Sequence, residues 1–222
     1  MRHALIVGAS RGIGHALAHS LADAGWQVST ASRNPPDSQV GAWHRADVSD
    51  PMQAEALVRA CEPIDALVIC VGDFHRARVT EESPESWRQT FASNLDPVFA
   101  LSRAALPGMI ERRWGRILCF TLAGLGRGSP RLAAYHAAKA GVLALTRSLA
   151  AEGAPFGVTA NCIAPGLIES SSPDELARMS PRVPAGRPGS LNEVVATARF
   201  LLSDEAGYLS GAEIPLSGGL GV

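Results

Sequence analysis

Short apolar runs alternate along the chain with longer stretches in which apolar residues return every three or four positions. The runs predict strands at 3–8, 26–32, within 41–48, and at 65–72, 115–121, 157–165 and 212–219. The helical spacing predicts helices at 12–24, 51–61, 84–112, 134–152 and 191–203, the third of them broken near Asp96. Strands joined by helices pair in parallel through right-handed crossovers. The pattern therefore predicts an α/β fold, a doubly wound parallel sheet of seven strands with helices on both faces.

Length and composition indicate one compact domain over residues 1–222. Hydrophobic residues make up 46% of the chain and charged residues 18%, proportions of a globular core rather than of a disordered chain. A net charge of -1 provides no basic field for nucleic acid or for an anionic membrane, and no apolar run is long enough to cross a bilayer.

The cysteines and the first residues bear on the compartment. Cys61, Cys70, Cys119 and Cys162 are widely spaced, which is typical of buried thiols rather than of disulfides or a zinc site. The apolar start runs directly into a glycine turn, so we expect a first strand there and not a signal peptide. We therefore expect a cytoplasmic protein with no metal, no nucleic-acid partner and no membrane partner.

A glycine-rich turn, GASRGIG, follows the first predicted strand and opens the first predicted helix. Its glycines, Gly8, Gly12 and Gly14, have the spacing GxxxGxG. Glycine lets the backbone turn tightly and approach a ligand closely, while the start of the following helix offers free N–H groups and a positive dipole end. Any strand-to-helix turn can need a glycine. The position after an N-terminal apolar strand nevertheless favours the pyrophosphate-binding turn of a Rossmann fold.

The residues after the second predicted strand bear on the choice of dinucleotide. An acid there would accept a hydrogen bond from the ribose 2′-hydroxyl of NAD, but the strand ends in Ser32-Arg33. Ser10 and Arg11 in the glycine turn add a hydroxyl and a second guanidinium, a set that suits a 2′-phosphate, so we predict NADP (NADPH). The alternative is that both arginines are solvated loop residues. Asp47 is placed either to accept from the adenine amino group or to start the next helix.

Tyr135 and Lys139 lie four residues apart in AAYHAAKAG and therefore share one face of the predicted helix. A free tyrosine, with a pKa of about 10, is a poor acid or base near neutrality, and a nearby ammonium lowers that pKa by favouring the phenolate. The pair can then give a proton to a carbonyl oxygen while hydride reaches the carbonyl carbon. Without other signals, the pair would be one Tyr and one Lys on an amphipathic helix.

With the glycine turn, the parallel alternation and the Tyr–Lys pair in this order, the chain resembles the classical short-chain dehydrogenase/reductase family over nearly all of residues 3–220. The nearest subgroup by pattern contains the β-ketoacyl carrier-protein reductases. The resemblance implies that Lys139 binds the cofactor ribose and that Asn94, in FASNLDPVF, supports a water linked to Lys139. It also implies that the Pro-Gly stretch of NCIAPGLIES lines the nicotinamide, where Ser170 replaces a Thr that contacts the cofactor.

One departure from the family lies after the fourth strand, where ICVG replaces NNAG, and we expect it to alter packing rather than chemistry. The cofactor contacts predicted from the motifs and the resemblance are Gly8, Ser10, Arg11, Gly12, Ile13, Gly14, Ser32, Arg33, Asp47, Val48, Val71, Gly72, Tyr135, Lys139, Pro165, Gly166, Ile168 and Ser170.

The family also uses a serine to hold the substrate carbonyl, and its position here is ambiguous. The usual spacing, 13 residues before the tyrosine, falls on Leu122, which has no hydroxyl. Alignment from the strand instead places Gly124 on the glycine that follows this serine by three residues. Thr121 then takes the serine's place, with one extra residue in the loop. We predict Thr121; a lost hydroxyl, a plain strand threonine and a contribution from Ser129 stay as alternatives.

Other residues and surfaces give weaker indications of function. His136 follows the tyrosine and should point about 100° away from it, so we do not assign it to catalysis. Arg112, Arg113 and Arg116 form either a solvated helix end or a docking patch for an acidic acyl carrier protein, as in some relatives. The helices at 84–112 and 134–152 are apolar over more than one face. Such helices pair between subunits in the family, so we expect a homo-oligomer, a dimer or a tetramer.

The sequence therefore predicts an NADPH-dependent ketoreductase with Tyr135, Lys139, Thr121 and Asn94 as its catalytic residues. Its expected substrate is a β-ketoacyl thioester or a related biosynthetic ketone. Two alternatives remain. One is an NADP-dependent secondary-alcohol dehydrogenase, and the other is a cofactor-binding sensor or scaffold without turnover, which Leu122 would favour and the intact Tyr–Lys pair opposes.

Overall fold

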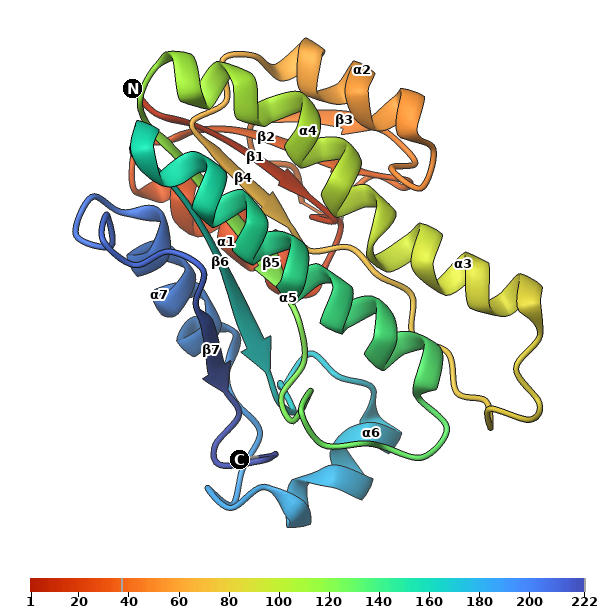
Figure 1. The fold of residues 1–222 in the computed structure, drawn as a ribbon. Coiled ribbons are helices and arrows are strands. Elements are labelled where there is room, and N and C mark those ends of the chain that lie inside the picture. Colours follow the sequence, from red (N-terminus) through yellow and green to blue (C-terminus); the bar gives the residue numbers. More distant parts are fainter. Residues whose placement is uncertain (37, 222) are drawn as a thin grey trace.

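The computed structural model describes residues 1–36 and 38–221, and in this part of the chain seven parallel strands form one sheet (Figure 1). The strand order is β3-β2-β1-β4-β5-β6-β7. The strands are β1 (His3–Val7), β2 (Gln27–Ser32), β3 (Ala42–Arg45), β4 (Ala66–Ile69), β5 (Gly115–Phe120), β6 (Val158–Pro165) and β7 (Glu213–Leu216). The predicted fold class is confirmed, and each strand lies within the range that the apolar runs predicted.

Helices cover both faces of this sheet. They are α1 (Gly12–Asp23), α2 (Pro51–Cys61), α3 (Pro84–Asn94), α4 (Asp96–Glu111), α5 (Ala133–Gly153), α6 (Pro173–Met179) and α7 (Leu191–Leu202), with short 3-10 turns at Ala154–Phe156 and Ser180–Arg182. The predicted break near Asp96 is confirmed, because Leu95 ends α3 and starts α4. The sequence analysis missed α6, although Ser172 caps it by accepting a hydrogen bond from the Glu175 N–H.

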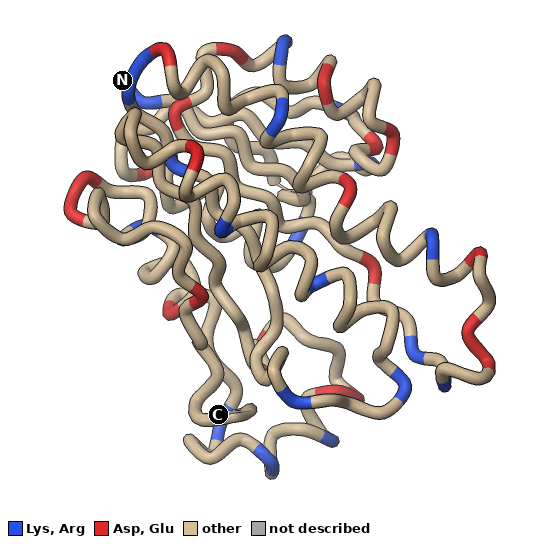
Figure 2. Tube along the Cα trace, in the orientation of Figure 1, with Lys and Arg blue, Asp and Glu red and all other residues tan. Residues whose placement is uncertain are grey.

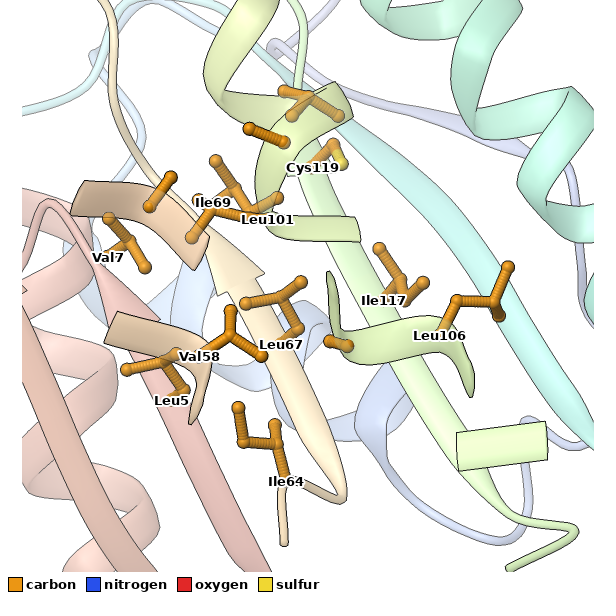
Figure 3. Close-up of a cluster of buried hydrophobic side chains, with 14 of the residues drawn as sticks. Leu5, Val7, Val58, Ile64, Leu67, Ile69, Leu101, Leu106, Ile117 and Cys119 are labelled. Carbon is orange, nitrogen blue, oxygen red and sulfur yellow. The ribbon is translucent and has the colours of Figure 1, made fainter. Parts of the chain in front are cut away.

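Alternation of side chains along the buried strands divides the core into two layers. One layer packs α2, α4 and α5 on the sheet; in Figure 3, Leu5, Leu67 and Ile117 of three neighbouring strands face Val58 and Leu101 of these helices. The other layer packs α1 and α7 on the opposite face (Figure 1). Strands buried on both faces need continuous apolar runs, which explains why the sequence pattern located them so well.

The strand order reverses direction at β1, whose neighbours are β2 and β4. Chain crossovers leave β1 toward one edge of the sheet and β4 toward the other, so a crevice opens between them at their C-terminal ends. Ligands of doubly wound sheets bind at this switch point. Blue and red positions are scattered along the trace in Figure 2, and the loops at the lower end of the view carry more blue positions than red ones.

The opposite end of the sheet is held by a cluster of aromatic and charged side chains. Asp204 accepts two hydrogen bonds of 2.7 Å from Arg2 and one of 3.0 Å from the Trp114 ring N–H. The Arg2 and Arg116 guanidiniums lie 4.1 and 4.4 Å from the centre of that ring. Arg116 is only 3% exposed, and its charge lies 3.9 Å from Asp204. Asp204 therefore orders both arginines around one tryptophan.

We predict that Asp204→Asn lowers the free energy of unfolding at pH 7 by up to about 1 kcal/mol, a modest value because the carboxylate is largely exposed. The hydrogen bond from Arg2 holds the pKa of Asp204 below its usual value. The carboxylate thus stabilises the fold above its ordinary pKa, and this stabilisation is lost as the pH falls through the lowered one. Urea unfolding at pH 7 and 3.5 should show the difference from wild type shrinking in acid; Asp23→Asn, at an exposed position, is the control. Equal losses in both variants would contradict the role of Asp204.

Candidate active site

A cleft of about 1450 Å³ opens where the strands end, and it is lined by residues that follow β1, β2, β4, β5 and β6. It brings together nearly all the residues that the sequence predicted for a site: Gly8, Ser10, Arg11, Gly12, Ile13, Gly14, Ser32, Arg33, Asp47, Val48, Val71, Gly72, Thr121, Tyr135, Lys139, Pro165, Gly166, Ile168 and Ser170. Asn94 is the exception, because it is 1% exposed and lies behind Gly72.

Close backbone approaches shape the glycine turn. Gly8 has a φ of +87°, and a Cβ there would lie 2.6 Å from the Cys70 carbonyl oxygen on the neighbouring strand end. A Cβ on Gly14 would lie 2.5 Å from the Gly8 carbonyl oxygen. Any larger residue at these two positions would push the turn away from β4 or α1 away from β1. The predicted need for glycine is therefore a packing requirement as well as a means of approaching a ligand.

The start of α1 fits a diphosphate. Arg11 is the N-cap residue, its side chain makes no capping hydrogen bond, and the first turn contains no acid. The backbone N–H groups of this turn therefore lack a side-chain acceptor and lie at the positive end of the helix dipole. Ser170, from the stretch after β6, lies across the turn, since a Cβ on Gly12 would be 3.8 Å from its Oγ. These features suit the diphosphate of a dinucleotide.

The end of β2 differs in detail from the prediction. The Ser32 hydroxyl donates to the Asn34 carbonyl oxygen at 2.6 Å and accepts from the Trp43 ring N–H at 3.0 Å, so it shapes the loop. Arg33 remains largely exposed, with a 3.5 Å ion pair to Asp73. Asp47 accepts from the Ser49 N–H and hydroxyl, and these hydrogen bonds, the hydroxyl first, keep its pKa below the usual value. The N-cap of α2 is Asp50, so the helix-start alternative for Asp47 is wrong.

One face of α5 carries the polar residues at the cleft floor. Tyr135, His136 and Lys139 line the cleft, and so does Leu132, the residue before the helix; Tyr135 and Lys139 share one face, as their spacing of four residues predicted. The Lys139 ammonium lies 5.6 Å from the centre of the Tyr135 ring and donates to the Phe120 carbonyl oxygen at 3.1 Å. His136 was expected to point away, but it borders the same cleft, and its buried Nε2 has no protein partner among the described residues.

The pKa of Tyr135 moves in the direction opposite to our expectation. Burial, and then the negative charge of Glu175 on α6, raise it to about 12. Burial lowers the pKa of Lys139 to about 8. For both groups, the loss of water therefore outweighs the attraction between ammonium and phenolate that the i, i+4 spacing suggested. The Phe74 ring packs edge-on against Tyr135, with centres 5.0 Å apart, and contributes to its burial. The protein interior thus keeps the phenol protonated, in the form that can donate a proton.

Asn94 connects to Lys139 through Gly72. Its side-chain amide donates to the carbonyl oxygens of Asp73 and Thr90, both at 3.0 Å, while its Oδ1 is buried without a protein partner. A Cβ on Gly72 would lie 2.3 Å from this Oδ1 and 3.3 Å from the Lys139 Nζ. The orphaned acceptor and the buried ammonium therefore face the same small space, which only a glycine at position 72 keeps open.

The end of β5 shows where the two candidate hydroxyl positions lie. Thr121 is 4% exposed, and its hydroxyl donates to the Glu213 carboxylate on β7 at 2.6 Å. Leu122 lines the cleft and supplies no hydroxyl, while Ser129 lines it from the exposed loop before α5. The sequence analysis missed Glu213. Its signal was an isolated acid at the start of an otherwise apolar strand, EIPL.

Three thiols, those of Cys70, Cys119 and Cys162, lie near Lys139, whereas Cys61 lies at the end of α2 beside His44. Burial raises the pKa of Cys70 to about 12 and that of Cys119 to about 11, and it also raises the pKa values of Cys61 and Cys162. All four cysteines are free.

No group of three or more His, Cys, Asp or Glu side chains suited to a metal ion occurs in residues 1–36 and 38–221. Over the same residues, no helix combines the length and the apolar character needed to span a bilayer.

The three arginines before β5 do not form one exposed patch. Arg116 is buried and donates to the carbonyl oxygens of Ser203 and Gly157. Arg112 lies 3.7 Å from Asp65 and bonds the Ile64 carbonyl oxygen. Arg113 alone extends over a surface ring, with its guanidinium 6.0 Å from the centre of Phe156. These contacts favour a structural role for at least two of the three.

Comparison with known proteins agrees with this geometry. A family model described as enoyl-(acyl carrier protein) reductase matches residues 8–221. The 3-oxoacyl-(acyl-carrier-protein) reductase of Escherichia coli is 34% identical over 98% of this chain and 96% of its own. The acetoacetyl-CoA reductase of Shinella zoogloeoides is 35% identical over 98% of both chains. A solved variant of actinorhodin polyketide ketoreductase with NADPH superimposes with a TM-score of 0.91 at 28% identity, covering 99% of this chain and 97% of its own.

The buried ammonium predicts a specific pH dependence of stability. The pKa of Lys139 is about 8 in the fold and about 10.4 when unfolded, so the unfolded chain binds more protons between these values. The folded state therefore gains stability as pH rises through this window. Relative to Lys139→Met, the wild type should gain roughly 2 kcal/mol in free energy of unfolding between pH 7.5 and 9.5. Urea unfolding at the two pH values measures this gain. If the difference in free energy of unfolding between wild type and Lys139→Met did not change with pH, the burial of the lysine would be contradicted.

Proposed function

Because the chain belongs to the short-chain dehydrogenase/reductase family, we propose that it is an NADPH-dependent ketoreductase acting on β-ketoacyl thioesters or related biosynthetic ketones. The observation that carries the proposal is the Tyr135–Lys139 pair at the floor of a cleft that begins at the glycine turn. The 3-oxoacyl-(acyl-carrier-protein) and acetoacetyl-CoA reductases, both about one-third identical along their whole length, support this class of substrate.

The dinucleotide would extend along the cleft from the end of β2 to α5. The N–H groups at the start of α1 would bind its diphosphate, Lys139 its ribose, and the stretch from Pro165 to Ser170 would border the nicotinamide. NADPH supplies a hydride to the carbonyl carbon. The absence of an acid at the end of β2, and the exposed guanidiniums of Arg11 and Arg33, support NADP over NAD.

Tyr135 would donate its proton to the carbonyl oxygen as negative charge develops there. Its raised pKa keeps the phenol protonated beforehand, and the Lys139 ammonium nearby stabilises the phenolate left behind. The Oδ1 of Asn94 faces the same space as the Lys139 Nζ and would hold a water through which the proton is replaced. In this arrangement Thr121 and Leu122 border the substrate. The Thr121 hydroxyl lies one residue before Leu122, where the family spacing places its serine.

The finer features of partner, assembly and location extend the same proposal. We propose that the thioester can be carried by an acyl carrier protein, for which Arg112 and Arg113 are the exposed arginines of the three considered. We also propose a homo-oligomer, dimer or tetramer, supported by Phe99, which is 56% exposed on α4. A cytoplasmic location agrees with four free thiols, three of them buried.

A role in binding without turnover is the second candidate, and Leu122 is the observation that favours it. A sensor would bind NADPH yet consume none with any ketone. The family description also names enoyl reduction, so a conjugated C=C substrate belongs in the assay. We therefore measure NADPH consumption with acetoacetyl-CoA, acetoacetyl-carrier protein and crotonyl-CoA. Consumption with the first two alone supports the proposal, consumption with crotonyl-CoA alone overturns it in favour of an enoyl reductase, and silence with intact NADPH binding favours the sensor.

We predict that Tyr135→Phe lowers kcat for acetoacetyl-CoA by about 10²- to 10⁴-fold, because the proposed proton donor to the carbonyl is removed. NADPH binding, followed by nucleotide fluorescence, should stay within a fewfold of wild type. The chain offers a matched control in Tyr208, which is fully exposed, and Tyr208→Phe should leave kcat unchanged. Retained turnover in Tyr135→Phe would remove the tyrosine from the mechanism.

We predict that Arg33→Ala raises the KM for NADPH about tenfold and leaves the KM for NADH unchanged, because only NADPH carries the 2′-phosphate. Arg59→Ala is the control, since Arg59 lies on α2 beside Glu55. Steady-state kinetics with both cofactors test this. An equal rise for both nucleotides would show that Arg33 acts on the shape of the turn rather than on the phosphate.

A further inference from the structure

The hydrogen bond between Thr121 and Glu213 joins the cleft wall to a residue behind it. Thr121 lines the cleft, whereas Glu213 on β7 is not among the described residues that do. The donor–acceptor distance of 2.6 Å is short, as expected when a hydroxyl donates to a carboxylate. Glu213 is half-buried beside Cys162, its register partner on β6. The acid is thus held within the sheet, two strands away from β5.

This bond fixes the hydrogen-bonding character of Thr121. A threonine hydroxyl has one hydrogen and two lone pairs, and a carboxylate can only accept. While the hydrogen points at Glu213, the oxygen presents lone pairs alone to any other partner. Redirecting the hydrogen toward the cleft would break a charge-assisted hydrogen bond and leave a half-buried carboxylate without it, which costs more than an exchange between neutral groups.

The neighbouring position does not compensate. Leu122, which also lines the cleft, offers neither donor nor acceptor in its side chain. The β5 end of the cleft therefore differs from a site in which a free hydroxyl donates to the substrate carbonyl: its polar side chain is an acceptor, and its neighbour is apolar. The donor that a carbonyl oxygen needs comes from Tyr135 on α5.

We propose that Glu213 is a specificity-determining residue that holds Thr121 as a hydrogen-bond acceptor, so that the cleft binds the alcohol form of its substrate more tightly than the ketone form. The inference rests on the proposed ketoreductase function and deepens it. The hydroxyl of a β-hydroxyacyl thioester can donate to the Thr121 oxygen. The carbonyl of a β-ketoacyl thioester has no hydrogen to donate, so its oxygen and the Thr121 oxygen would repel each other as two acceptors.

The test compares the two forms on the same protein. We measure the KM for acetoacetyl-CoA and the product-inhibition constant of 3-hydroxybutyryl-CoA, and we define the selectivity ratio as the inhibition constant divided by the KM. In wild type this ratio should be below one. Glu213→Gln removes the charge at constant size and replaces the charge-assisted hydrogen bond by a weaker neutral one, which lets the Thr121 hydrogen turn toward the cleft, so the ratio should rise about tenfold. Glu205→Gln, which changes an exposed acid in the turn after α7, should leave it unchanged.

Substitutions of Thr121 distinguish this role from a structural one. Thr121→Ser keeps the hydroxyl and should keep the wild-type ratio, whereas in Thr121→Val the further change Glu213→Gln should have no effect on the ratio. A purely structural acid would change the melting temperature in each variant without moving the ratio. An unchanged ratio in folded Glu213→Gln overturns the inference alone. Failure of the wild type to reduce any ketone overturns the proposed function, and the inference with it.

Discussion

The contact between the glycine turn and the end of β4 is the constraint on which the cleft depends. Gly8 leaves no room for a Cβ against the Cys70 carbonyl oxygen, and Gly14 leaves none against Gly8. These two close backbone contacts allow α1 to start directly above the switch point of the sheet, where its unbonded N–H groups face the cleft. Every other part of the site is placed relative to this start, because the parallel strands bring their C-terminal ends to the same edge.

Desolvation governs the electrostatics of the cleft floor. Tyr135 and Lys139 are both withdrawn from water, and each is pushed toward its neutral form. A tyrosine that stays protonated and a lysine that titrates near neutrality suit a site that must deliver a proton and then regain one. The same withdrawal leaves the Oδ1 of Asn94 without a partner beside Gly72, so the floor is organised around a small polar space enclosed by apolar packing.

The sequence predicted the sheet and most of the cleft because both follow from local patterns. Apolar runs locate strands buried on two faces, and the turn after each strand carries its cleft residues to one edge. It did not predict the direction of the Tyr135 pKa shift, since spacing shows which groups are neighbours but not how much water they lose. Nor did it identify Glu213, whose bond to Thr121 spans 92 positions along the chain. His136 was set aside from helix geometry alone, although a helix face is wide enough to bring it to the cleft.

The buried thiols give the protein a practical property as a reagent. Thiolate is the species that reacts with maleimides and disulfides, and burial raises the pKa of all four native cysteines. Near neutral pH these thiols are therefore mostly protonated, and we expect the folded chain to react slowly with such labels, Cys70 at the cleft being the most accessible of the four. A single cysteine introduced at an exposed site, for example on α6 beside the cleft, would be modified selectively. Fluorophores or spin labels could then report on cleft motion without removing any native residue.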